Sequence, residues 1–247
     1  MTDRSILITG GSSGIGAAVA VMAAKRGYAR VILTYAHNPD KAEAVANAVR
    51  AHGADAEIFK TDVADPQSIA TLFASVRALS PLPLDLVNNA GIVDQKASIA
   101  DLTPQRVQNI FAINVLGAFE VARQAVAYMR DHMGGGIVNI TSTAARKGMA
   151  NEYIDYAATK AAIDTFTIGL ADELAPEGIR VNAVRPGLID TEIHAKGGIP
   201  DRLEQFAHTT PMGRAGTADE VAEAVLWLLS DQASYTTRTT IDVAGGR

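Results

Sequence analysis

The stretch Thr9-Gly10-Gly11-Ser12-Ser13-Gly14-Ile15-Gly16 follows directly on the short apolar run Ser5–Thr9. That run has the length and composition of a buried strand, and the Ala-rich residues that continue to Arg26 are typical of a helix. Glycines at such a junction let the backbone turn tightly and approach a pyrophosphate, while the helix N-terminus offers free N–H groups. The stretch predicts a strand, a glycine turn and a helix that together bind a dinucleotide. A tight turn that binds nothing is the alternative interpretation.

The alternation of apolar runs with helical patterns continues along the whole chain. Strands that alternate with helices predict a parallel sheet covered on both faces. We therefore expect an α/β, doubly wound Rossmann-type sheet of about seven strands. The further expected strands are Arg30–Tyr35, Ala56–Lys60, Leu84–Val87, Gly136–Thr141, Ile179–Val184 and Thr239–Val243, and the further expected helices are Asp40–His52, Asp65–Leu79, Thr103–His132, Asp155–Leu174 and Ala218–Leu229.

The domain organisation predicted from this pattern is simple. No linker, low-complexity tract or repeat divides residues 1–247, which predicts a single domain. The segment Leu188–Gly216 is the exception, because it is rich in Gly, Pro, Thr and charge. We expect it to be an inserted loop or lid that covers a substrate.

Composition excludes several classes of protein. The chain has 247 residues, 48% hydrophobic and 20% charged, with a formal net charge of -5 and no basic stretch suited to a phosphate backbone. Nucleic acid is therefore not expected as a partner. The absence of cysteine excludes disulfides and thiolate metal sites, and the five histidines are scattered, so we expect no metal. The first apolar run is too short for a signal peptide. We also expect no apolar run to reach the roughly 20 residues of a membrane span. A cytoplasmic protein without a membrane partner is predicted.

Further short motifs follow the expected strands in order. Together with the spacing T-G-x-x-x-G-x-G, they make the chain resemble the short-chain dehydrogenase/reductase family over essentially its whole length. Asn151–Tyr156 and Asp242–Gly246 resemble a subgroup of glucose-dehydrogenase-like and 3-oxoacyl-carrier-protein-reductase-like enzymes. The motifs are Asp62-Val63, Asn88-Asn89-Ala90-Gly91, Asn114, Ser142, Tyr156-Ala-Ala-Thr-Lys160, Pro186-Gly187 and Thr191.

The resemblance implies an NAD(P)-dependent oxidoreductase that transfers a hydride between a nicotinamide and an alcohol or ketone carbon, with Tyr156 as general acid/base. Tyr156 and Lys160 are four residues apart, so on a helix they share a face. A phenol titrates near 10, and lowering that pKa by two to three units needs roughly 3–4 kcal/mol. A cation about 4 Å away supplies around 4 kcal/mol at an effective dielectric near 20, so one lysine is nearly sufficient and an oxidised nicotinamide adds positive charge. An exposed Tyr/Lys pair on a helix surface is the alternative.

Ser142 and Asn114 complete the catalytic set that the resemblance implies. Ser142 follows a strand at the edge where parallel sheets bind ligands, and its hydroxyl would orient the substrate oxygen. Thr143 is the fallback, and a turn serine is the alternative reading. Asn114 stands at a poor helix position, where the family uses an asparagine to distort the helix and hold a water that relays protons from Lys160. A solvent-facing or locally bonded amide is the alternative.

The remaining motifs imply cofactor contacts. Asp62 would bond the adenine amino group with Val63 packed nearby, although a helix-cap role, which Asp65 could equally fill, is open. One group of residues would border the adenosine ribose, and a second group would contact the nicotinamide carboxamide. Ordinary strand-to-loop turns are the alternative interpretation for both groups. The ribose group is Asn89, Ala90 and Gly91, and the carboxamide group is Pro186, Gly187, Ile189 and Thr191.

The end of the second strand predicts which nicotinamide cofactor is preferred. Folds that choose NAD place an acid about 20 residues after the glycine turn, to bond the ribose 2′-OH. Here Tyr35 and His37 occupy that region and no acid appears before Asp40. We expect NADP to be preferred, with NAD possible, and His37, Ser12 and Ser13 to contact the 2′-phosphate. A surface role for His37 in an enzyme that uses both cofactors is the alternative.

Assembly and substrate are less clear from sequence. Apolar helices and an uncovered last strand predict a homotetramer. The substrate is expected to be a small alcohol or carbonyl compound, with Tyr153, Ile193 and His194 as pocket candidates. Arg238 stands where relatives often have glycine.

Two other classes of protein are compatible with a glycine turn. A nucleotide-binding regulator without turnover would have degraded catalytic residues. An S-adenosylmethionine methyltransferase gives no reason for Tyr156 and Lys160 on one helix face.

Overall fold

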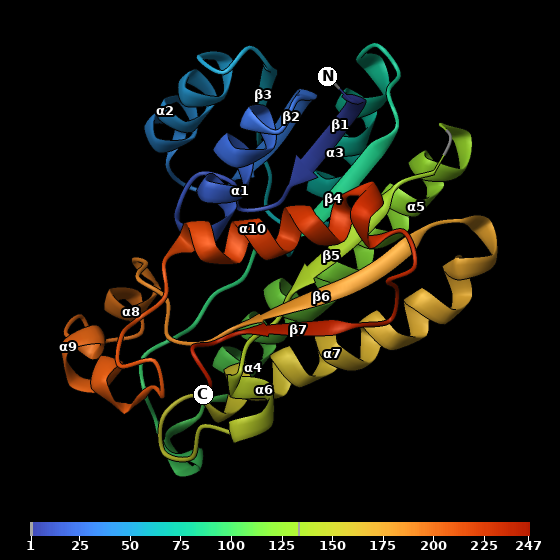
Figure 1. Cartoon of the computed structure of the whole chain (residues 1–247). Helices are drawn as coiled ribbons and strands as arrows, with labels where there is room; N and C mark the ends of the chain where they lie inside the picture. Colours follow the sequence, from blue (N-terminus) through green and yellow to red (C-terminus); the bar gives the residue numbers. More distant parts are fainter. Residues whose placement is uncertain (1, 133) are drawn as a thin grey trace.

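The computed structural model describes residues 2–132 and 134–247. Its sheet has seven parallel strands in the order β3-β2-β1-β4-β5-β6-β7 (Figure 1). This confirms the predicted doubly wound α/β class. The strands are β1 (Thr2–Ile8), β2 (Tyr28–Tyr35), β3 (Asp55–Lys60), β4 (Leu84–Asn88), β5 (Gly136–Ile140), β6 (Arg180–Pro186) and β7 (Thr240–Val243).

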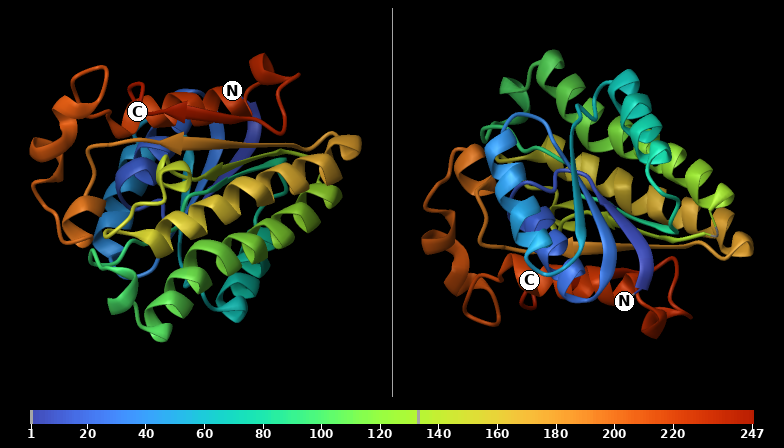
Figure 2. Two further views of the ribbon diagram at one scale, coloured as in Figure 1. Left: turned by 90° about the horizontal axis from the view of Figure 1, so that it is seen from below. Right: turned by 90° about the horizontal axis from the view of Figure 1, so that it is seen from above.

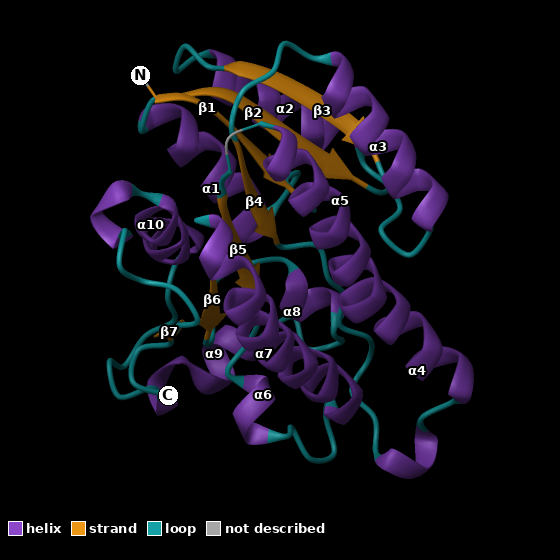
Figure 3. Cartoon of the chain, turned by 90° about the vertical axis from the view of Figure 1, so that its right-hand side faces the viewer, coloured by secondary structure: helices purple, strands orange, loops and turns teal. Residues whose placement is uncertain are grey.

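Helices cover both faces of the sheet. Figure 3 shows α1 and α10 on one side of the strands and α3 and α5 on the other. The helices are α1 (Gly14–Lys25), α2 (Pro39–Arg50), α3 (Pro66–Ala78), α4 (Pro104–Phe111), α5 (Ala118–Asp131), α6 (Ala144–Lys147), α7 (Ile154–Leu174), α8 (Ile193–Lys196), α9 (Arg202–Phe206) and α10 (Ala218–Leu229).

The apolar strands form two cores because alternate side chains point to opposite faces. Ile6 and Ile8 of β1 pack with α1, α2 and α10, whereas Leu7 between them packs with α3, α5 and α7. All three side chains are fully buried. Each contributes roughly 1.5–3 kcal/mol relative to exposure, so this short run stabilises both layers at once.

The strand order reverses between β1 and β4, because the chain leaves β1 toward β2 and β3 and returns to β4 on the other side. Ligands of such sheets bind in the crevice outside the carboxyl ends of the strands, at this switch point. Both views in Figure 2 place the segment of residues 188–216, drawn in orange, beyond one end of the strands.

The predicted continuous helix Thr103–His132 is wrong in its middle. The structure has α4, then a π-helix over Ala112–Gly117, then α5. Apolar periodicity continues across this region, so the local pattern favours an unbroken α-helix. The wider turn is instead fixed by Asn114, whose buried amide bonds to a loop outside the helix.

The expectation about apolar runs also needs correction. Pro104–Asp131 is long and apolar enough, by length and composition, to pass the test for a membrane-spanning helix, and no other described helix passes it. In the fold its inner face packs on the sheet through Val121, Ala122 and Ala125. Core helices pass the same test, so the absence of a membrane partner stays a prediction.

The other predicted elements agree to within two residues at each end, except that β1 begins three residues earlier than predicted, at Thr2, and α10 agrees at both ends. The segment Leu188–Gly216 was predicted without elements of its own, but it contains α8, α9 and a 3₁₀ turn, Ala207–Thr209. Arg238 adopts a left-handed φ of 63° before β7, the conformation that glycine favours. Its Nε lies 2.9 Å from Asp172 Oδ1, which ties this turn to α7.

Candidate active site

The glycine turn is held by hydrogen bonds from two neighbouring strands. Gly10 has φ +64°, and its N–H donates to Thr34 Oγ1 at 3.2 Å. Asn89 Nδ2 donates to the carbonyl oxygens of Thr9 and Gly10 at 2.9 and 3.1 Å. A Cβ on Gly16 would lie 2.4 Å from the Gly10 oxygen, so only glycine fits there. The amide of Asn89 therefore braces the turn, and its side-chain donors are already used.

The turn presents the start of α1 to the crevice. Ser13 is the N-cap and makes no side-chain cap hydrogen bond, and the first turn of α1 contains no acid. Unpaired N–H groups and the positive end of the helix dipole favour an anion such as a pyrophosphate. Thr191 lies against Gly14 from across the crevice, since its Cγ2 is 3.4 Å from where a Cβ on that glycine would be. Ser12 and Ile15 are half-buried beside them.

The structure brings Ser142, Tyr156 and Lys160 together. Tyr156 and Lys160 lie near the start of α7, and Ser142 lies in the loop after β5. Lys160 Nζ donates to the carbonyl oxygen of Ile140 at 2.8 Å and lies 5.7 Å from the centre of the Tyr156 ring. Ser142, and not the fallback Thr143, is the side chain whose interaction with the phenol lowers the pKa of Tyr156.

Burial governs the protonation of this pair. It raises the pKa of Tyr156 above its ordinary value of 10.0, which the hydrogen bond with Ser142 offsets only in part. Burial also lowers the pKa of Lys160 to about 8, opposed by the nearby Asp164 carboxylate. The predicted lowering of the Tyr156 pKa is therefore not found for these groups alone, because desolvation of the buried phenol is the largest influence on its pKa. A phenol that keeps its proton at neutral pH is suited to protonate a carbonyl oxygen.

Asn114 is buried and fully engaged, which contradicts the solvent-facing and locally bonded alternatives. It is 1% exposed, and its amide bonds to both backbone groups of Ile92, at 2.8 and 2.9 Å, and donates to Thr159 Oγ1 at 3.1 Å. A Cβ on Gly91 would lie 3.2 Å from Asn114 Oδ1 and 3.4 Å from Lys160 Nζ. Asn114 Oδ1 and Lys160 Nζ thus lie close to the same point beside Gly91.

The predicted adenine contacts lie at the ends of β3 and β4. Asp65 is the N-cap of α3 and accepts from Gln67 N at 2.9 Å, so the capping alternative for Asp62 is wrong. Asp62 is exposed, and its carboxylate accepts only the N–H of Ala64 among the described residues. Val63 is buried against the π-helix. The loop Asn89–Gly91 lies at the neighbouring strand end, with the N–H of Ala90 bound to Thr9 Oγ1 at 3.0 Å.

The end of β2 and the loop after it contain Tyr35 and His37, the residues predicted to lie near the cofactor ribose. Tyr35 is half-buried against the core, and His37 is exposed in the bend that leads to α2. Lys41 of α2 reaches across to Glu192, with Nζ 2.5 Å from Oε1. This ion pair joins the region of the predicted 2′-phosphate site to the 188–216 segment.

The loop after β6 is fixed by β7 and β5. The N–H of Gly187 donates to Val243 O at 2.9 Å, and Pro186 O accepts from Thr143 N at 3.0 Å. Ile189 is 4% exposed and belongs to the core, so its side chain faces away from solvent. The predicted carboxamide contacts thus differ in kind: Thr191 offers a side chain, whereas Ile189 does not.

A cavity of about 120 Å³ opens beside Ser142 and Tyr156. Ile193 and Tyr153 line it, as expected of pocket residues, and the side chain of His194 lies outside the described part of the structure. Sequence reasoning missed most of the other lining residues, and no local pattern singles them out. They are Val93, Ala144, Lys147, Met149, Leu188, Arg202 and Arg247.

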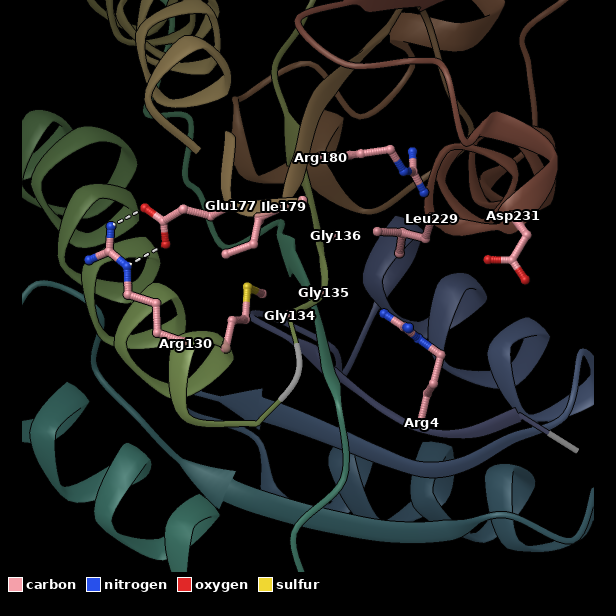
Figure 4. A pocket seen from close by; sticks show the side chains of 12 residues that line it. Arg4, Arg130, Gly134, Gly135, Gly136, Glu177, Ile179, Arg180, Leu229 and Asp231 are labelled. Carbon is pink, nitrogen blue, oxygen red and sulfur yellow. Dashed lines mark hydrogen bonds and ion pairs between the residues drawn. The ribbon is translucent and has the colours of Figure 1, made fainter. Parts of the chain in front are cut away.

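A larger cavity of about 540 Å³ lies at the opposite, amino end of the strands, among Arg4, Arg130, Glu177 and Arg180 (Figure 4). Two of its arginines form ion pairs with carboxylates. Arg130 pairs with Glu177 at 2.6 Å, and Arg4 with Asp85 at 2.6 Å. It contains none of the predicted site residues, so its size does not make it the active site. The described residues contain no group of three potential metal ligands.

Known proteins resemble the chain over nearly its full length. Residues 10–247 match the family described as enoyl-(acyl carrier protein) reductase. Oxidoreductase YgfF of Escherichia coli (strain K12) is 44% identical over 98% of both chains, and acetoacetyl-CoA reductase of Rhizobium meliloti (strain 1021) is 37% identical over 99% of this chain and 98% of its own. A short-chain dehydrogenase of Burkholderia cenocepacia J2315, solved in complex with NADP, has a TM-score of 0.89 at 33% identity and covers 99% and 98% of the two chains.

Proposed function

Since the chain belongs to the short-chain dehydrogenase/reductase family and is an oxidoreductase acting on CH–OH or C=O groups, we propose that it reduces a small ketone or aldehyde with a hydride from NADPH. The observation that carries this proposal is the meeting of Ser142, Tyr156 and Lys160, of which Ser142 and Tyr156 line one cavity at the carboxyl end of the sheet. A regulator without turnover would not need this set, and a methyltransferase would not use it.

The proposed roles follow from the contacts. Tyr156 gives its proton to the carbonyl oxygen, and Ser142 hydrogen-bonds the same oxygen and orients it. Lys160 supplies positive charge near the phenol. Asn114 holds a water beside Gly91 through which Lys160 exchanges protons with solvent. A nicotinamide cofactor, when bound, supplies or accepts the hydride.

The residues around the crevice fit a dinucleotide. The free N–H groups of α1 suit a pyrophosphate, and the exposed Asp62 carboxylate suits an adenine amino group. The ribose and nicotinamide contacts are assigned to the backbone of Asn89–Gly91 and Pro186–Gly187, to Thr191, and to Lys160. Val63 packs below the adenine, while Ile189 contributes backbone only. The chain folds as one domain, in which residues 188–216 act as the lid.

We predict that kcat/KM with NADPH exceeds that with NADH by about tenfold for one shared carbonyl substrate, a difference of about 1.4 kcal/mol. No carboxylate at the end of β2 repels a 2′-phosphate, and His37, Ser12 and Ser13 are exposed or half-buried beside it. The measurement is loss of nicotinamide absorbance with each cofactor over a panel of carbonyl compounds. His37→Asp should shift the ratio toward NADH. A clear NADH preference in the unaltered enzyme would contradict the assignment.

We also predict a homotetramer. Leu116, Phe119 and Ile168 leave large apolar side chains 66%, 45% and 40% exposed on the π-helix, α5 and α7, and β7 is an open sheet edge. Two separate self-complementary surfaces are what a tetramer with two-fold axes needs. Sedimentation velocity at micromolar concentration should show the tetramer, and Leu116→Glu should yield a smaller species. A monomeric unaltered protein under these conditions would rule the assembly out.

The cytoplasmic location of the protein also stays a prediction.

A further inference from the structure

Three cationic side chains line the cavity that contains Ser142 and Tyr156. They are Lys147 of α6, Arg202 of α9 and Arg247 beyond β7, which lie far apart in the sequence. No carboxylate belongs to the lining of this cavity among the described residues. Only Glu152 pairs with one of them, through its Oε2 at 2.8 Å from Arg202 Nη2. The described side chains that line this cavity therefore carry a net positive charge.

Arg202 is built into the lining of this cavity rather than free on the surface. It is 8% exposed, and its guanidinium carbon lies 5.4 Å from the centre of the Tyr153 ring and 5.1 Å from that of Phe206. These contacts and Glu152 hold the guanidinium in one orientation. A rigid, planar guanidinium is suited to bind a carboxylate or phosphate through two parallel hydrogen bonds.

One nitrogen of this guanidinium is left without a partner. Arg202 Nη1 is buried and makes no hydrogen bond to any described residue. Leaving a buried donor unpaired costs about 1–3 kcal/mol, more when the group is charged. Of the described side chains with such an unpaired polar atom, Arg202 alone lines one of the two cavities. Its missing partner is thus to be sought in the ligand of that cavity.

The two other cations are unpaired as well. Lys147 makes no side-chain hydrogen bond or ion pair in the described part of the chain, and desolvation together with Arg247 and Arg202 lowers its pKa. The guanidinium of Arg247 lies 5.9 Å from the centre of the Phe206 ring and has no carboxylate partner among the described residues. Lys147 and Arg247 therefore lack a carboxylate partner among the described residues, and only Arg202 has one. Repulsion among these neighbouring cations is relieved when an anion enters.

We propose that the carbonyl substrate of this enzyme carries an anionic group, a carboxylate or a phosphate, which Arg202 Nη1, Lys147 and Arg247 bind while the carbonyl lies between Ser142 and Tyr156. This specificity rests on the proposed reductase function.

The test compares matched pairs of substrates with NADPH: levulinate against its methyl ester, and dihydroxyacetone phosphate against dihydroxyacetone. We expect kcat/KM to be higher for one anion or both than for the neutral partner by about tenfold to a hundredfold, the range of a charge-assisted hydrogen bond. The first pair reports a carboxylate and the second a phosphate. Equal rates within both pairs would overturn the proposed specificity and leave the reductase function standing, whereas no turnover of any compound with either cofactor would overturn both.

Variants of Lys147 and Arg202 test which side chains bind the anionic group of the substrate. Lys147→Gln changes an exposed side chain, and we expect a KM for the anion about tenfold higher with kcat and the neutral substrate little affected. Lys147→Glu should raise the anion KM further. Arg202→Met keeps the apolar packing and should act in the same direction, with cofactor binding measured separately to show that the lid has folded. Lys25→Gln, at the far end of α1, is the matched control. An anion preference that survives both Lys147→Gln and Arg202→Met would overturn the assignment of the binding groups.

Discussion

Tyr156→Phe is expected to lower kcat by about a hundredfold to ten-thousandfold, the usual contribution of a positioned proton donor. The substitution removes only the hydroxyl that hydrogen-bonds with Ser142 and leaves the ring on α7. Because burial keeps this phenol protonated, the loss should be greatest in the direction of carbonyl reduction. Single-turnover kinetics with NADPH measure the chemical step directly.

Two comparisons make this result specific to Tyr156. Cofactor affinity, measured by fluorescence titration, should change by no more than about twofold, since the hydroxyl contributes to the transition state rather than to binding of the cofactor. Tyr235→Phe is the matched control, because that side chain is fully exposed and lies outside both cavities. Near-normal turnover of Tyr156→Phe would remove this residue from the mechanism.

Lys160→Met is expected to remove most activity and yet to stabilise the protein. The ammonium is 5% exposed, and its pKa is lowered from 10.5 to about 8 by burial. A shift of this size corresponds to about 3 kcal/mol of destabilisation by the buried charge. Loss of the hydrogen bond to Ile140 O offsets about 1 kcal/mol of the gain. At neutral pH the variant should therefore melt about 4–8 °C higher, while kcat falls about a hundredfold or more.

The pH dependence separates this explanation from improved packing. Below pH 8 the lysine is protonated in both states, and the folded protein bears the full cost of burying the charge. Between pH 8 and 10.5 only the unfolded chain keeps the proton, so the free energy of unfolding of the unaltered protein rises with pH. The stability gain of Lys160→Met should thus shrink across this window and vanish near its upper end. A gain that is independent of pH would show that the charge is not the cause.

Cofactor affinity provides a further readout on the same variant. The proposed contact of Lys160 with the nicotinamide ribose predicts that NADPH binds about tenfold more weakly to Lys160→Met, as expected for the loss of one charge-assisted hydrogen bond. Titration at a pH below 8 keeps the unaltered lysine charged for the comparison. Unchanged affinity would refute this contact without affecting the proton-transfer role.

Most of the fold could be predicted because its signals are local. A strand buried on both faces is a short apolar run, and a dinucleotide turn needs glycine where the backbone adopts a positive φ or approaches another chain segment closely, as at Gly10 and Gly16. The four-residue spacing of Tyr156 and Lys160 likewise specifies a shared helix face. The 188–216 segment lacked such signals, since helices of four or five residues carry too few periods to be recognised.

The errors of prediction arose where distant groups overrule the local pattern. The apolar periodicity of Thr103–His132 favours one α-helix, but the amide of Asn114 is satisfied by Ile92, and the helix widens into a π-turn there. The spacing of Tyr156 and Lys160 brings them to one face, but it does not reveal that burial outweighs their mutual influence. Desolvation depends on everything packed around a group, which one helix cannot disclose.

Local sequence patterns specify the succession of strands and helices along the chain and the glycine turn, because each depends on neighbours within a few positions. The resemblance to the family indicates the residues of the candidate catalytic set. Only the tertiary structure decided which charges share the substrate cavity. Lys147, Arg202 and Arg247 come from three parts of the chain that no periodic pattern connects, and they line one cavity only because the tertiary fold brings those parts together. Electrostatic interaction depends on distance through space and on burial, so the charge of this pocket exists only once the chain has folded.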